Sequence, residues 1–167
     1  NKRTILALEY KVPLNLMPID TRSDTIYLSS EKKTEEVACK FLEKINKGFI
    51  VFLHGEMGVG KTTFTRYLIN GFQKKIGINL TEVTSPTFNL MNEYQVDTLK
   101  IKHFDLFRLN SQDEIKGLDL FEENENCITL IEWPQIIKKK PKNLIELFFE
   151  YGKDHQTRSV QIKGLDL

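Results

Sequence analysis

The segment Gly55-Glu-Met-Gly-Val-Gly-Lys-Thr62 constrains this chain more than any other feature. It matches the pattern G-x-x-x-x-G-K-[ST], in which glycines let backbone N–H groups turn inward around phosphate oxygens. The lysine reaches the outer phosphates, and the hydroxyl group after it is a ligand for magnesium. The pattern therefore predicts a phosphate-binding loop, or P-loop. The residues expected around the phosphates are Glu56, Met57, Gly58, Val59, Gly60, Lys61, Thr62 and Thr63.

The residues on either side of this loop have the pattern that a P-loop requires. Phe49-Ile-Val-Phe-Leu53 is a continuous apolar run, which indicates a buried strand. After the loop, apolar residues at helical spacing predict a helix over residues 62–75, whose amino end favours bound anions. Upstream, Ser30 is a favourable N-cap and Gly48 occupies the place of a C-terminal glycine cap, so a further helix is expected between them.

The rest of the chain is rich in strand patterns. Residues 88–95 and 99–109 predict two strands joined by a tight turn, and residues 127–131 predict another buried strand. Residues 144–151 and 158–162 have the pattern of a hairpin. A crossover helix combined with hairpins predicts an α/β fold: a P-loop NTPase-like mixed β-sheet flanked by helices, in three layers.

Length and composition narrow the classes of protein that fit. The 167 residues suit one domain, so we expect a single P-loop domain over residues 25–167 and a loosely attached N-terminal extension over residues 1–24. A net charge of +1 gives no argument for a nucleic-acid or membrane surface, and no apolar run approaches the ~20 residues of a membrane span. Cys39 and Cys127 belong to no zinc-binding pattern, and free thiols suit a cytoplasmic protein.

A P-loop enzyme also needs a carboxylate for the metal and a group that orients the attacking water. Glu132 directly follows the apolar run 128–131, as in a Walker-B strand, and Asp105 lies in the segment 103–108. The alternative for each is a solvated acid at a strand end, but the upstream P-loop favours the functional interpretation. His103 is interpreted as a hydrogen-bonded structural residue. Because no Asn-Lys-x-Asp motif for guanine is present, the expected nucleotide is ATP, with Mg²⁺.

Four short motifs follow the P-loop: Ser85-Pro-Thr-Phe88, Asn92-Glu-Tyr94, His103-Phe-Asp-Leu-Phe-Arg-Leu109 and Glu132-Trp-Pro134. In this order and spacing, the chain resembles the TsaE family, bacterial P-loop ATPases of the tRNA threonylcarbamoyladenosine (t6A) pathway. The likeness is strong over residues 25–135 and weaker in the C-terminal hairpin. It implies an ATPase, weak when alone, that acts with the proteins TsaB and TsaD. Their assembly modifies the adenosine beside the anticodon, so contact with tRNA is indirect.

The resemblance also implies roles for individual residues. Lys61 binds phosphate and, with the acidic residue Asp105, serves hydrolysis. Thr62 and Glu132 hold magnesium, and Trp133 lies beside the nucleotide, although a packing role is an equal alternative for this tryptophan.

The switch-like loop of the family corresponds to residues 85–87, for which a plain turn is the alternative. Val59 and Phe107 depart from the family pattern, which more often has a small residue and a tyrosine at these places.

Two other functions fit a P-loop. One is a small-molecule kinase, but the chain shows no arginine-rich lid, since Arg66 and Arg108 are scattered. The other is a nucleotide-dependent binding switch without useful turnover. The serial motifs favour the ATPase of the t6A pathway over both.

Overall fold

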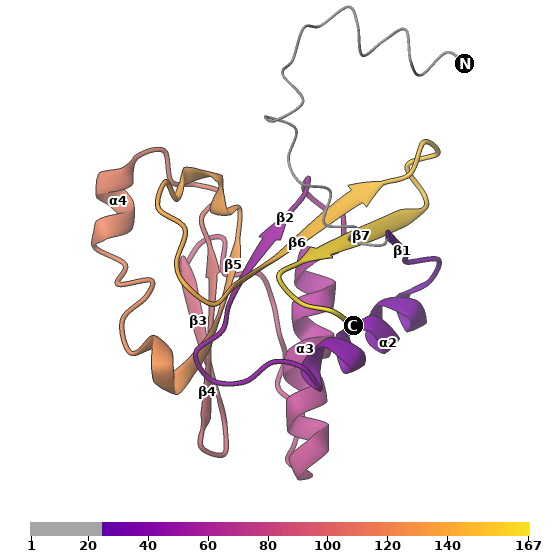
Figure 1. The fold of residues 1–167 in the computed structure, drawn as a ribbon, viewed down its shortest axis with the longest axis horizontal. Coiled ribbons are helices and arrows are strands. Elements are labelled where there is room, and N and C mark those ends of the chain that lie inside the picture. Colours follow the sequence, from indigo (N-terminus) through magenta and orange to yellow (C-terminus); the bar gives the residue numbers. More distant parts are fainter. Residues whose placement is uncertain (1–24) are drawn as a thin grey trace, which may run out of the picture.

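A seven-stranded sheet with two long helices on one face forms the centre of the molecule (Figure 1). The computed structural model describes residues 25–167, and the expected extension over residues 1–24 lies outside them. The helices and strands are β1 (Ile26–Tyr27), α2 (Glu31–Leu42), β2 (Ile50–His54), α3 (Lys61–Ile76), β3 (Met91–Val96), β4 (Leu99–Asp105), α4 (Gln112–Lys116), β5 (Cys127–Glu132), β6 (Leu144–Tyr151) and β7 (Arg158–Lys163), with short 3₁₀ turns η2 (Asn124–Asn126) and η3 (Pro134–Ile136).

The sheet is mixed, as the sequence predicts. Its strand order is β1-β7-β6-β2-β5-β4-β3. The four central strands β6, β2, β5 and β4 run parallel, whereas the pairs β1–β7, β6–β7 and β3–β4 are antiparallel. The predicted hairpins therefore form the two sides of a parallel centre, and the P-loop strand β2 lies in the middle of that centre.

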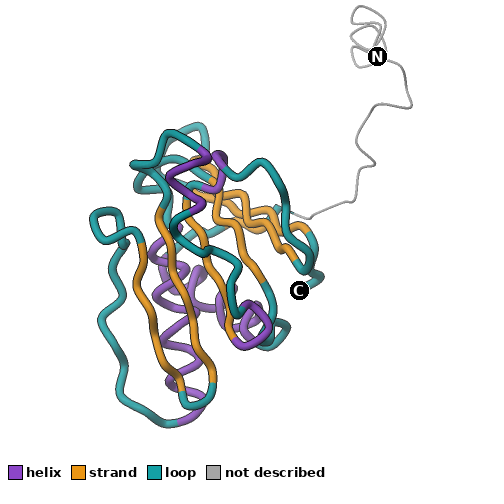
Figure 2. Tube along the Cα trace, turned by 90° about the vertical axis from the view of Figure 1, so that its left-hand side faces the viewer, coloured by secondary structure: helices purple, strands orange, loops and turns teal. Residues whose placement is uncertain are grey.

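Alternation along the central strands divides the core into two layers. Val51 and Leu53 of β2 face α2 and α3, where they join Phe41 and Phe64 in the larger hydrophobic cluster. Figure 2 shows the long helix behind the strands of the sheet. The two helices pack on each other as well as on the sheet, and the rings of Phe41 and Phe64 meet edge to face at 5.5 Å.

The opposite face of the sheet has a thinner cover. Ile50 and Phe52 of β2 point to this side and form a second cluster with Phe104 and Ile131. Residues of the segment around α4 and of η3 close it, which completes the predicted three layers. Within residues 25–167, no helix has the length and apolar character needed to cross a bilayer.

The predicted start of the first long helix is confirmed and its predicted end is wrong. The Ser30 side chain accepts a hydrogen bond from the Lys33 N–H, as an N-cap should. The helix ends at Leu42, however, and Glu43 caps it in a right-handed conformation. Gly48 instead occupies a turn with φ +95° and donates its N–H to the carbonyl of Cys127, so it aligns the entry to β2 with β5.

Two strand boundaries also differ from the predictions. β3 begins at Met91, and Phe88, expected at the start of this strand, lies in a turn with 84% of its surface exposed. β4 ends at Asp105, because the next residue, Leu106, no longer pairs with β3. Its N–H donates to the carbonyl of Glu132. The chain thus turns away immediately after the acidic residue.

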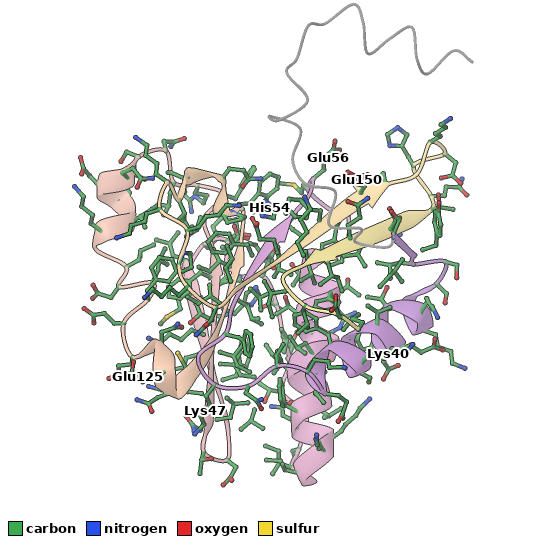
Figure 3. All side chains as sticks on the ribbon, viewed as in Figure 1. Lys40, Lys47, His54, Glu56, Glu125 and Glu150 are labelled. Atoms are coloured by element: carbon green, nitrogen blue, oxygen red, sulfur yellow. The ribbon has the colours of Figure 1, made fainter. Side chains whose placement is uncertain are left out.

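The parallel strands bring several loops to the same edge of the sheet. In Figure 3, Lys47 and Glu125, which precede β2 and β5, lie at one end of the sheet, and Glu56, which follows β2, lies at the other. Asp105 and Glu132 are paired in register at the carboxyl ends of β4 and β5. Ligands of open α/β sheets bind at this carboxyl edge, so the candidate site is expected there.

Candidate nucleotide-binding site

Between β2 and α3, the chain forms the loop geometry that the sequence predicts. Gly55, Gly58 and Gly60 all have positive φ angles, of +140°, +76° and +116°. α3 starts at Lys61, and no side chain caps its amino end. A helix that starts without a side-chain cap leaves backbone N–H groups for an anion, and its dipole favours negative charge there.

Lys61 is almost completely buried, with 4% of its surface exposed. Its Nζ donates hydrogen bonds to the carbonyls of Gly55 at 2.7 Å and Glu56 at 2.8 Å, so the loop folds around the ammonium group. Burial holds the pKa of Lys61 below its ordinary value, although the carboxylates of Glu132 and Asp105 act in the opposite direction. The site therefore presents a poorly solvated cation, which gains from an anionic ligand.

Thr62, on the first turn of α3, meets the end of β5. Its hydroxyl donates to Glu132 Oε1 at 2.9 Å, and the same oxygen is 2.9 Å from Nε2 of His103. The Thr62 hydroxyl oxygen and Glu132 Oε1 belong to the two residues that the sequence predicts as magnesium ligands. Hydroxyl and carboxylate oxygens are the hard ligands that this ion takes, usually only one or two from the protein, so the pair fits a Mg²⁺ ion.

Asp105 is held in a hydrogen-bonded cluster at the end of β4. Its Oδ2 accepts from the hydroxyls of Ser85 at 2.5 Å and Thr87 at 2.8 Å, while Oδ1 accepts from the backbone N–H of Phe107 at 2.9 Å. The segment 85–87 is therefore more than a turn between strands. It lies against the acidic residue and closes one side of the site.

These groups surround one cavity of about 230 Å³. Of the residues predicted from sequence, nine line it: Met57, Gly58, Gly60, Lys61, Thr62, Thr63, Asp105, Glu132 and Trp133. Glu56 and Val59 do not. Glu56 contributes its carbonyl to Lys61, and Val59 is fully buried in the core beneath the loop. Ser85 and Thr87, from the expected switch-like loop, and Phe107 complete the lining.

Trp133 packs against neighbouring side chains and also lines the cavity, so its expected place beside the nucleotide stays a prediction. The Lys61 Nζ lies 4.3 Å from the centroid of its ring, a cation–π contact, and the ring of Phe107 packs against it at 4.8 Å. The residue also has φ +58°, an uncommon angle for a side chain of this size. A strained backbone at a cavity wall is typical of functional sites, where the surrounding packing holds it in place.

A second cavity, of about 270 Å³, lies across the P-loop from the first. The two share Gly58, Gly60 and Thr63 as lining. The remaining lining of the second cavity includes Ser30 at the start of α2 and Arg158 at the start of β7. The Nε atom of Arg158 is buried and has no hydrogen-bond partner among the described residues. A buried donor in this state lacks the hydrogen-bond partner that such groups normally have.

Sequence reasoning missed two residues that the hairpin β6–β7 supplies. One is Arg158; the other is Tyr151, whose hydroxyl donates to the carbonyl of Met57 at 3.1 Å and so supports the P-loop. No motif marks either residue. The available signal was topological, because a strand that neighbours β2 in parallel must end beside the P-loop, as β6 does at Tyr151.

A mixed α/β sheet with a P-loop between its central strand and a helix defines a protein of the P-loop NTPase-like fold. The chain belongs to the TsaE family: the family model described as "Threonylcarbamoyl adenosine biosynthesis protein TsaE" matches residues 28–160. The resemblance noted from the motifs is thereby confirmed. The family takes part in the biosynthesis of threonylcarbamoyladenosine in tRNA.

Relatives from distant bacteria support this assignment. The chain is 44% identical over 126 residues to the tRNA threonylcarbamoyladenosine biosynthesis protein TsaE of Rickettsia bellii, covering 75% of this chain and 84% of the relative. Against the TsaE protein of Nostoc sp. it is 32% identical over 154 residues, 89% of this chain and 90% of the relative. The crystal structure of Bacillus subtilis YdiB has a TM-score of 0.63, at 23% identity and 83% coverage of both chains, which supports the fold alone.

Proposed function

We propose that this chain binds ATP with Mg²⁺ at the P-loop and hydrolyses it as a component of the t6A machinery. The observation that carries the proposal is the convergence of four side chains on one cavity: Lys61, Thr62, Asp105 and Glu132. They come from α3, β4 and β5, and each has the chemistry that a step of phosphoryl transfer to water requires.

The two cavities on either side of the P-loop support a nucleotide rather than free phosphate. The triphosphate would occupy the cavity that holds Lys61 and Thr62. The sugar and base would extend over Gly58 and Gly60 into the second cavity, where Ser30 and Arg158 offer polar groups.

In the proposed reaction, a water oxygen forms a bond to the γ-phosphorus while the bond from that phosphorus to the bridging oxygen of ADP breaks. Lys61 neutralises charge on the phosphate oxygens, and Asp105, whose Oδ1 accepts one hydrogen bond and keeps a lone pair, orients the water and accepts its proton. Magnesium held by Thr62 and Glu132 would supply further charge neutralisation. The hydroxyls of Ser85 and Thr87 fix the direction of the Asp105 carboxylate.

The pathway indicates the setting of this hydrolysis. TsaB and TsaD are the proposed partners, tRNA would be reached through their assembly, and the proposed compartment is the cytoplasm. Exposed Phe88 directly follows Thr87, so a change in the contact between Thr87 and Asp105 would move an apolar surface residue. This connection offers a route from the nucleotide to a partner.

The test is ATP hydrolysis by the purified protein with magnesium, alone and with TsaB and TsaD from the same source. Lys61→Ala is the blank. We expect slow turnover alone and a clear increase when both partners are present. Turnover that the partners leave unchanged would remove the proposal of a common assembly, and phosphorylation of an added small acceptor would favour a kinase.

A further inference from the structure

We propose that His103 is a positioning residue for the metal site: its imidazole holds the carboxylate of Glu132 in the direction that binding of Mg²⁺ requires. The inference rests on the proposed function, because it concerns the same site. It assigns a task to a buried polar side chain that neither the P-loop nor the hydrolysis step uses directly.

Strand register explains how the two residues meet. His103 on β4 is paired with Leu130 of β5, and Asp105 with Glu132. His103 is therefore the diagonal neighbour of Glu132 across the two strands. Residues two apart on a strand share a face, which places His103 and Asp105 on the same side of the sheet. That side is the one covered by α3, which carries Thr62 in its first turn.

The hydrogen-bond pattern fixes which partner donates. Glu132 Oε1 accepts from the Thr62 hydroxyl and lies 2.9 Å from His103 Nε2. An ionised carboxylate can only accept, so Nε2 carries the hydrogen. The Nδ1 atom of His103 has no partner among the described residues. The ring is therefore anchored at Glu132 and at no other described polar group.

Burial makes this contact directional. His103 has no exposed surface and the Glu132 side chain has 3%, so water does not compete for the bond. The Thr62 hydroxyl can rotate toward a metal ion, whereas His103 stays fixed in the sheet and still restrains Oε1. Glu132 Oε2 accepts no hydrogen bond from a described residue, and it belongs to a side chain that lines the cavity. Groups that hold a metal-binding side chain in this way typically contribute 10- to 100-fold to metal affinity.

The experiment measures how much magnesium strengthens nucleotide binding. Trp133 is the chain's only tryptophan and lines the cavity, so its fluorescence reports binding of the non-hydrolysable analogue AMP-PNP. Each protein is titrated once with saturating Mg²⁺ and once with EDTA, and the ratio of the two dissociation constants is compared. The variants are His103→Leu, which removes the donor, and His103→Gln, whose side-chain amide replaces it near Nε2.

The matched control is Lys102→Met on the same strand. Lys102 is nearly buried and donates to the carbonyl of Glu122, so the variant also loses one buried hydrogen bond of β4, but away from the cavity. We expect the ratio of the dissociation constant in EDTA to that in Mg²⁺ to be at least about tenfold smaller in His103→Leu than in wild type. The affinity of this variant in EDTA should be unchanged. His103→Gln and Lys102→Met should keep most of the effect.

Three results overturn the inference. They are an undiminished magnesium effect in His103→Leu, an equal loss of affinity with and without magnesium, and wild-type binding that magnesium does not alter. In all three cases wild type still binds the nucleotide, whereas absence of AMP-PNP binding by wild type would remove the proposed function as well. If His103→Leu does not fold, the inference is tested by NMR on the wild-type protein. Addition of Mg²⁺ to the AMP-PNP complex should then shift the His103 Nε2 signal and not that of His54, and an unmoved His103 signal contradicts the proposal.

Discussion

At the scale of single residues, the P-loop is built around a cation that its own carbonyls hold. Lys61 donates to the carbonyls of Gly55 and Glu56, and these two hydrogen bonds hold its ammonium group at the centre of the loop. Side-chain entropy that is lost on folding need not be lost again on binding. The same two contacts tie the start of α3 to the end of β2.

Lys61→Ala is expected to weaken ATP binding about 10- to 100-fold, the loss of one or two charged hydrogen bonds of about 1.5–3 kcal/mol. Thermal unfolding checks this by ligand linkage. At ATP equal to 100 times the wild-type dissociation constant, wild type gains about 2.7 kcal/mol, and a variant with hundredfold weaker binding gains about 0.4 kcal/mol. Lys74→Ala, which removes an exposed lysine at the other end of α3, is the control. Equal stabilisation of both variants would contradict the role of Lys61.

Asp105→Asn separates binding from hydrolysis. The amide keeps the shape of the side chain and loses the charge that orients and deprotonates water, so turnover should fall at least about 100-fold. AMP-PNP affinity, measured through Trp133 fluorescence, should change little, because Asp105 is not assigned to phosphate or metal. Wild-type turnover in the variant would contradict the role of Asp105 in hydrolysis.

At the scale of elements, the junction from β2 to the P-loop leaves no space for a side chain. A Cβ atom on Gly55 would lie 2.6 Å from the carbonyl oxygen of Phe149 on β6 and 2.8 Å from Val59 Cγ1. Gly77, at the end of α3, also has a positive φ but no atom within 4 Å of such a Cβ. Comparing alanine substitutions at Gly77 and Gly55 therefore separates the cost of backbone strain from the cost of a steric clash.

Gly77→Ala is expected to cost about 1–2 kcal/mol, the price of a left-handed residue. Gly55→Ala adds the clash with β6 and should cost about 3 kcal/mol or more. Chemical denaturation of both variants measures the difference. Equal losses would show that β6 moves aside and that the close packing of the loop on this strand is not needed.

The element boundaries show what local patterns can and cannot predict. The P-loop, its strand and α3 follow from neighbouring residues alone. Gly48 was wrongly predicted as a helix cap, because its positive φ serves a contact with Cys127, which is remote in sequence. Phe88 was wrongly predicted as a strand residue, because its turn is held by the contacts of Ser85 and Thr87 with Asp105. Both errors arise where tertiary hydrogen bonds decide the local conformation.

The residues of the candidate site also fall into two groups, those that the sequence predicts and those that it does not. Lys61 and Thr62 follow from a linear motif, Glu132 from its place after an apolar strand, and Asp105 from the motif 103–109, although the predicted strand continued to residue 109. His103 and Arg158 could not be placed, because their contacts depend on the register between β4 and β5 and on the position of β7 in the sheet. A single sequence carries strand periodicity but not strand order.

At the scale of the whole molecule, one ion cluster links stability to pH. Burial holds the pKa of His54 below 6.5. Burial raises the pKa of Glu146, but its hydrogen bonds with Lys140 and His54 outweigh that effect and leave it below 4.5. In both cases the unfolded chain binds the proton first as pH falls, so the free energy of unfolding decreases.

We therefore expect stability to decline in two stages between pH 7 and pH 4, first below about 6.5 and again below about 4.5. Urea denaturation across this range tests the expectation. His54→Gln should remove the upper stage and keep the lower one, since Lys140 still pairs with Glu146. A flat profile from pH 7 to below the ordinary pKa of Glu146 would show that these groups do not carry the dependence.

The position of β6 also matters for synthesis of the protein on the ribosome. β2 is paired on one side with β5 and on the other with β6, which ends at Tyr151. A nascent chain that has released β2, α3 and β5 still carries β2 as an open strand edge, the kind of surface that pairs with other chains. The P-loop thus receives its support from Tyr151 only after β6 has left the ribosome, and a premature stop before residue 144 would release an aggregation-prone fragment.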